Sequence, residues 1–88
     1  MYKIVYTKTA VKDIPKLKAV HLDKKAKALI DLIAQDPYKM PPRYEKLVGS
    51  LAGIYSRRIN LQHRLVYQVY EEEQTIKIIS LWSHYERL

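Results

Sequence analysis

The pattern of side chains at the start of the chain predicts a first strand, in which Tyr2, Ile4 and Tyr6 alternate with Lys3 and Val5. A helix is expected to follow, because Thr7 or Thr9 can cap its N-terminus with a side-chain oxygen. Pro15 lies inside the helical pattern, so the helix is expected to be short, to begin late or to be kinked there. The apolar positions on its one face are Ala10, Ile14 and Leu17.

A second set of apolar residues recurs at the spacing of one helical face and predicts a longer helix. Asp36 and Pro37 are expected to end it, because the residue before a proline avoids helical backbone angles. Residues 37–50 contain three prolines with basic and aromatic side chains, and they are expected to form a connection. The apolar stripe of the helix comprises Leu22, Ala26, Leu29, Ile30 and Ile33.

The second half of the chain has the pattern of strands separated by short turns. The turns at residues 60–62 and 71–74 are short enough to make both strand pairs antiparallel hairpins. The predicted strands are residues 54–59, 64–70 and 75–83.

The last of these strands carries apolar residues on both faces, which is typical of a central strand. The first strand can then pair on its free side. The sequence therefore predicts an α+β fold in which residues 1–88 form one domain. We expect a four-stranded antiparallel sheet with both helices on one face and a site on the other, partly open face. The last strand should carry Ile76, Ile78 and Trp82 on one face, and Ile79 and Leu81 on the other.

Composition and charge narrow the classes of function. The chain has 16 Lys and Arg against 9 Asp and Glu, and its net charge of +7 attracts nucleic acid or acidic proteins. The alternative is a basic surface without a particular partner. The 8 tyrosines favour nucleic acid further, because their rings can stack on RNA bases. No run approaches the ~20 apolar residues of a membrane span, and the N-terminus lacks a signal-peptide core, so a cytoplasmic protein is expected.

The residue types also exclude or disfavour several kinds of chemistry. The absence of cysteine removes disulfides, thiolate nucleophiles and cysteine-based zinc sites. With 2 glycines there is no glycine-rich phosphate loop. His21, His63 and His84 show no metal-ligand spacing with one another or with carboxylates. We therefore expect neither a metal nor a cofactor, and we look for a dispersed acid–base site.

Three residues from separate segments fit the cleavage of RNA, which carries its own nucleophile, the ribose 2′-hydroxyl. Cleavage needs a base, an acid and cations that stabilise the charged phosphorane. Glu45 lies among basic and tyrosyl residues, and those cations would keep it ionised as a base. Arg64 is expected on the face opposite the core, where its guanidinium could hold a phosphate through two hydrogen bonds. His84 follows the last strand, and its imidazolium could donate a proton near neutral pH.

Each of these residues also has an ordinary structural interpretation. Glu45 could be a solvated loop carboxylate, Arg64 could pair with a carboxylate across the sheet, and residues 84–85 could be a frayed tail. The sequence leaves open which of Arg57 and Arg58 lies on the same face of the sheet as Arg64. A three-residue turn puts Arg58 on the face of Arg64, whereas a two-residue turn puts Arg57 there.

Three ordered motifs stand out: residues 51–59 (LAGIYSRRI), residues 63–67 (HRLVY) and residues 84–85 (HY). Together they resemble the YoeB/Txe branch of the RelE toxin superfamily, whose pattern is L-S-G-x-[WY]-S-R-R-I, then H-R-L-V-Y, then H-Y. Upstream, residues 45–47 resemble its P-E-x-L segment, with Tyr44 where proline is usual. The resemblance spans nearly the whole chain, which departs from the pattern by continuing with Glu86, Arg87 and Leu88 after H-Y.

The resemblance implies a microbial-ribonuclease-like toxin that enters the ribosomal A site and cleaves the messenger RNA codon there. It implies Glu45 as general base and His84 as general acid. It also implies that Arg64 and Arg58 bind the scissile phosphate. Tyr85 would position or stack the RNA. The residues expected to bind RNA or phosphate are Arg58, Arg57, Lys46 and Tyr85.

The resemblance also implies partners. An acidic antitoxin of the YefM/Axe type would wrap the toxin with an initially disordered tail and block the site, which suits a protein of charge +7. The ribosome, messenger RNA and a second copy of the chain are the other expected partners. Two rival functions stay open: a ParE-like protein that poisons a topoisomerase and lacks the acid–base set, and a toxin-fold protein that only binds because its catalysis has decayed.

Overall fold

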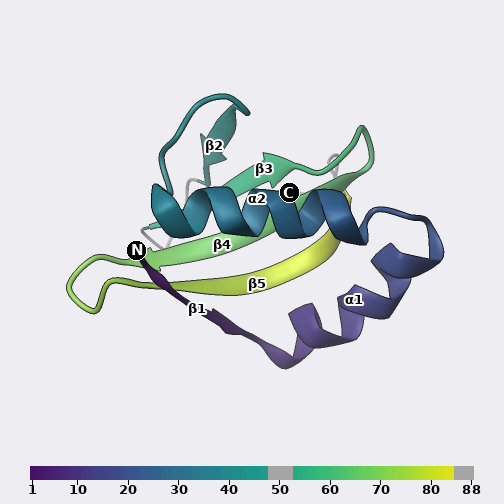
Figure 1. Ribbon diagram of the computed structural model, residues 1–88, viewed down its shortest axis with the longest axis horizontal. Coiled ribbons are helices and arrows are strands. Elements are labelled where there is room, and N and C mark those ends of the chain that lie inside the picture. The colour runs from purple at the N-terminus through teal and green to yellow at the C-terminus, as the bar shows by residue number, and fades with distance from the viewer. Residues whose placement is uncertain (48–52, 85–88) are drawn as a thin grey trace.

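The structure is a computed structural model, and it describes residues 1–47 and 53–84, apart from the side chain of His84. Two helices lie beside a curved sheet (Figure 1). In chain order the elements are β1 (Lys3–Tyr6), α1 (Lys8–Ala19), α2 (Asp23–Gln35), β2 (Tyr44–Lys46), β3 (Ile54–Arg58), β4 (His63–Tyr70) and β5 (Thr75–His84).

The strands form a five-stranded mixed sheet in the order β1-β5-β4-β3-β2. Neighbouring strands are antiparallel except β1 and β5, which run parallel with Ile4 opposite Ile76. The predicted four-stranded antiparallel sheet is therefore wrong in two respects, although β5 does lie between two strands as expected. β2, at 3 residues, is too short to show an alternating pattern. The direction of β1 depends on the path of the chain through both helices, which no local pattern encodes.

The helices begin and end close to the predicted residues. Thr7 caps α1, because its hydroxyl oxygen accepts a hydrogen bond from the backbone N–H of Ala10 at 3.0 Å. α1 continues through Pro15, so it is neither short nor late. Val11, whose carbonyl loses its helical partner at Pro15, is 54% exposed, so water can hydrate that carbonyl. α2 ends at Gln35, as predicted. Among the described residues, no helix has the length and apolar character needed to cross a membrane.

The start of α1 closes the outer edge of β5 beyond the residues that pair with β1. Thr7 donates from its backbone N–H to the carbonyl of Ile78 at 3.1 Å, and from its hydroxyl to the carbonyl of Ile79 at 2.7 Å. The backbone N–H of Leu81 donates to Oδ2 of Asp13 at 2.9 Å. Asp13 is 3% exposed, so a buried carboxylate takes the place of a neighbouring strand at this edge.

Both helices bury apolar residues in one core cluster against the sheet, as predicted. In Figure 1, α2 lies across the sheet and α1 lies beside the edge formed by β1 and β5. Alternate residues of β4 point into the core, and Arg64 therefore lies on the other face of the sheet, as the sequence predicted. The core cluster comprises Ala10 and Leu17 from α1, Ala26, Leu29, Ile30 and Ile33 from α2, and Ile59, Leu65, Tyr67, Val69, Ile76, Ile78 and Leu81 from the later part of the chain.

Register shifts between β4 and β5 change which residues of β5 face the helices. Tyr67 pairs with Ile78, but the residue before it pairs with Ser80, so Ile79 is an extra residue in β5. Leu81 consequently joins the core instead of the opposite face. The prediction for Leu81 was wrong because an alternating pattern does not reveal a bulge.

Candidate active site

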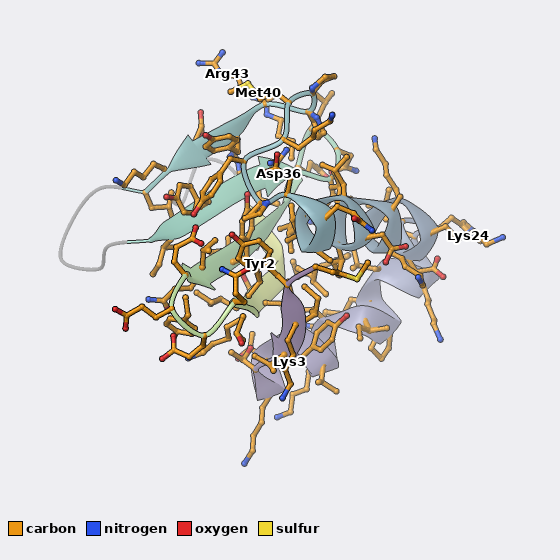
Figure 2. All side chains as sticks on the ribbon, turned by 60° about the vertical axis from the view of Figure 1, so that its left-hand side comes forward. Tyr2, Lys3, Lys24, Asp36, Met40 and Arg43 are labelled. Carbon is orange, nitrogen blue, oxygen red and sulfur yellow. The ribbon has the colours of Figure 1, made fainter. Side chains whose placement is uncertain are left out.

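A pocket of about 460 Å³ opens on the sheet face opposite the helices. Alternation along β4 explains its position: Leu65 and Tyr67 face the core, and Arg64 faces the pocket. Arg43 belongs to the loop before β2 and projects outward from it (Figure 2). The pocket is lined by Pro42, Arg43, Glu45, Arg58 and Arg64.

Arg64 forms the floor of this pocket. The residue is 2% exposed, and its Nη1 donates to Oγ of Ser56 at 2.7 Å and contacts Oε1 of Glu45 at 2.9 Å. Ser56 is itself fully buried, so its hydroxyl is a fixed acceptor for the guanidinium. These contacts hold Arg64 in one orientation, as a group that must stabilise developing charge requires.

Glu45 reaches the pocket from β2, the edge strand. Its backbone lies opposite Ser56 in the register of β2 and β3, which puts its side chain on the pocket face. The side chain is 43% exposed, in contrast to 3% for that of Arg64. A carboxylate that is held by a buried cation but open to solvent can accept a proton from a bound molecule.

Arg58 shares this face. Its Cα lies opposite Arg64 in the register of β3 and β4, and it lines the pocket. The backbone N–H of Ile59 donates to the carbonyl of His63 at 2.8 Å, so residues 60–62 form a three-residue turn. The alternative left open by the sequence is thereby decided in favour of Arg58. Three arginines and one carboxylate line the pocket, an arrangement that attracts phosphate.

Arg57 lies on the opposite face of β3, and the expectation that it binds RNA or phosphate at the site is corrected. The residue is fully buried, and its guanidinium donates to Tyr67 and to the carbonyls of Pro37 and Pro42. Alternation along the strand is the physical reason, because neighbouring residues point to opposite faces.

Of the remaining predicted residues, the structure describes Lys46 in full and the backbone of His84. Lys46 is exposed in β2, and alternation turns it away from the face of Glu45. His84 ends β5, where its Cα lies opposite His63 and next to Ser83, the partner of Arg64. The side chain of His84 and all of Tyr85 lie outside the described residues.

Sequence reasoning missed Ser56 as a component of the site. The signal was available, because Ser56 precedes Arg58 by two positions in a predicted strand and must share its face. Its role follows only from the fold, since the contact with Arg64 joins two strands.

A second polar cluster lies away from the pocket and joins three distant segments. The hydroxyls of Tyr38 and Tyr2 donate to the two carboxylate oxygens of Glu71. These two hydrogen bonds hold the pKa of Glu71 below its usual 4.5. The described residues contain no group of three or more His, Asp or Glu side chains that could hold a metal ion.

Comparison with known proteins places the chain among bacterial toxins. A family model described as a YoeB-like toxin of bacterial type II toxin-antitoxin systems matches residues 6–85. A relative, the toxin YoeB of Synechocystis sp., is 42% identical over 64 residues, which cover 73% of this chain and 72% of the relative.

Two solved structures from Staphylococcus aureus are similar over nearly the whole chain. A chain of the YoeB-YefM complex has a TM-score of 0.78 at 34% identity, covering 97% of this chain and 99% of that one. A chain of the YoeB dimer has a TM-score of 0.81 at 34% identity, covering 96% of this chain and 98% of that one.

Proposed function

Because the chain belongs to the family of YoeB-like toxins of bacterial type II toxin-antitoxin systems, we propose that it is a ribosome-dependent endoribonuclease that cleaves messenger RNA in the A site. The observation that carries this proposal is the contact of 2.9 Å between Arg64 and Glu45 inside a pocket with two further arginines. A base beside phosphate-binding cations is what cleavage by the ribose 2′-hydroxyl requires.

In the proposed reaction Glu45 takes the proton of the 2′-hydroxyl, and the 2′-oxygen attacks the adjacent phosphorus. The guanidinium groups of Arg64 and Arg58 stabilise the negative charge that develops on the phosphorane. The bond from phosphorus to the 5′-oxygen then breaks, and His84 protonates that oxygen. Tyr85 stacks on or positions the RNA. The products carry a 2′,3′-cyclic phosphate on one fragment and a 5′-hydroxyl on the other.

This reaction uses a nucleophile that belongs to the substrate and acid–base groups that belong to the protein, so no cofactor is assigned. We propose that residues 1–88 act as one domain in the cytoplasm. The partners are the ribosome with its messenger RNA, a second copy of the chain, and an acidic YefM/Axe-like antitoxin that covers the pocket. The three pocket arginines favour an acidic segment for that role.

The test is to incubate the protein with ribosomes that carry a defined codon in the A site and to map the RNA ends. We expect one cut per programmed codon, a 2′,3′-cyclic phosphate terminus and the same rate in the presence of a transition-metal chelator that leaves the magnesium of the ribosome in place. The matched variant is Glu45→Gln, which keeps the shape of the side chain and removes the base. A parental rate in Glu45→Gln, or abolition of cleavage by the chelator, would contradict the mechanism.

The same preparation separates the rival functions. A ParE-like protein would leave the RNA intact and inhibit DNA supercoiling by a topoisomerase. A decayed toxin would bind ribosomes and cut nothing.

A further inference from the structure

Arg57 carries a charge, yet it is fully buried on the helix side of β3. Its Nη1 donates to the carbonyl of Pro42 at 2.6 Å, and its Nη2 donates to the carbonyl of Pro37 at 3.0 Å. Its Nε donates to the hydroxyl of Tyr67 at 3.0 Å, and that hydroxyl donates in turn to Pro37 at 2.9 Å. Burial raises the pKa of Tyr67, so its hydroxyl keeps the proton that it donates.

The two carbonyls belong to opposite ends of the segment that joins α2 to β2. This segment arcs away from the helix before it enters β2 (Figure 1). The ring of Tyr44, two residues after Pro42, lies 5.0 Å from the guanidinium carbon of Arg57. Tyr44 is also the register partner of Arg57. One side chain therefore holds the segment at its start, at its end and at the first residue of β2.

β2 needs such support more than the other strands do. It has 3 residues, and it lies at the edge of the sheet with β3 as its neighbour in the order of strands. A strand this short has few ladder hydrogen bonds to fix it, so contacts before and after it decide its position. Glu45 is its middle residue, and a shift of β2 moves the carboxylate relative to Arg64.

An apolar residue at position 57 would avoid the cost of burying a charge. It would also lose the planar fork that reaches two carbonyls at once. The contacts of Arg57 go to neutral oxygens and an aromatic ring, and no carboxylate among the described residues forms an ion pair with it. Its bonds are thus directed at the backbone that leads to Glu45.

We propose that Arg57 is a positioning residue, which fixes β2 through the carbonyls of Pro37 and Pro42 so that Glu45 is held against Arg64. The proposal rests on the proposed role of Glu45 as general base. Arg57 does not touch the RNA; it acts through Glu45.

The experiment is a double-mutant cycle on the rate of A-site cleavage under single-turnover conditions. The variants are Arg57→Met, Glu45→Gln and the double variant. Arg57→Met is expected to lower the cleavage rate by roughly 10- to 100-fold, because a small misplacement of a catalytic group has effects of that size. The half-saturating toxin concentration should stay unchanged. The double variant should cleave no more slowly than Glu45→Gln, because a residue that acts through Glu45 has nothing left to position.

Three results would overturn the proposal. One is a folded Arg57→Met protein that cleaves at the parental rate. Another is a loss that appears only as weaker ribosome binding, since this would mean contact with RNA. The third is a double variant in which the two losses multiply. Leu17→Ala serves as the control for stability, because it opens a cavity under α1, which packs chiefly against β5 and not against β2. It should lower the melting temperature and leave cleavage at 25 °C unchanged.

Arg57→Lys decides the matter if Arg57→Met does not fold. The lysine ammonium group can bond one of the two carbonyls but cannot span both. The cleavage rate of Arg57→Lys should therefore lie between those of wild type and Glu45→Gln. Amide hydrogen exchange at residues 44–46 gives a readout that does not depend on catalysis. Faster exchange there in Arg57→Lys supports the positioning role, and unchanged exchange refutes it. If the wild type cuts no RNA, the proposed function fails while the exchange result still stands.

Discussion

Arg64→Lys offers a sharp test of how the pocket stabilises charge, because it keeps the positive charge of the side chain and removes the planar guanidinium group. In the wild type one nitrogen of Arg64 binds both Ser56 and Glu45, and the side chain is 3% exposed. A lysine ammonium is a single point donor that cannot hold these partners and a phosphate in one plane. Removing one donor to a developing oxyanion lowers the rate by ~10²–10³, which corresponds to about 2.7–4 kcal/mol.

We therefore expect Arg64→Ala to show that full loss and Arg64→Lys to show about one order of magnitude less. Single-turnover cleavage on programmed ribosomes, measured over a range of toxin concentrations, separates the rate from binding. Lys24→Ala removes one positive charge at the far end of α2, well away from Arg43 at the pocket (Figure 2), and should cleave at the parental rate. The reasoning would be refuted if Arg64→Lys cleaved at the same rate as wild type, or if Lys24→Ala lost as much of the cleavage rate as Arg64→Lys.

Four further outcomes are expected. His84→Gln should lower the turnover by ~10²–10⁴ with ribosome binding intact, and weaker binding at full turnover would rule out its role as acid. Asp13→Ala leaves the buried N–H of Leu81 without its acceptor, so urea denaturation should show a loss of about 1–3 kcal/mol; an unchanged midpoint would contradict this. The folded-state pKa of Glu71 lies below 4.5, so its contribution to stability is present above pH 4.5 and is lost as the pH falls through the folded value. Glu71→Gln should consequently melt below wild type at pH 6, and this gap should narrow as the pH falls below 4.5; a gap that does not change with pH would be inconsistent with the Tyr38 contact. Association with the acidic antitoxin should slow as salt rises, and a rate independent of ionic strength would exclude steering by the pocket arginines.

Local sequence patterns correctly predicted the features that depend only on residues within one helix or strand. The apolar stripe of α2 and the Asp36-Pro37 stop gave its limits within a residue or two, because side-chain burial and proline sterics act over short distances. The alternation of β4 placed Arg64 on the face opposite the core for the same reason.

Features that depend on pairing between distant segments were not predictable in this way. β2 forms by pairing with β3, and the extra residue at Ile79 belongs to the register between β5 and β4. Arg57 is the clearest case. Its neighbour Arg58 has the same chemistry, and only the length of the turn at residues 60–62 decides which of the two faces the pocket. The burial of the other then follows from strand alternation.

The parallel pairing of β1 with β5 has a consequence for how the chain folds. Lys3 must find Thr75, so both helices and all the other strands lie between the two partners in the sequence. Pairings across such separations are slow to form, because the entropy of closing a long loop is lost before any contact compensates for it. A nascent chain presents β2, β3 and β4, which carry Glu45, Arg58 and Arg64, before it has made the strand that completes their core. The pocket is therefore expected to form only late in synthesis, once β5 has joined the sheet.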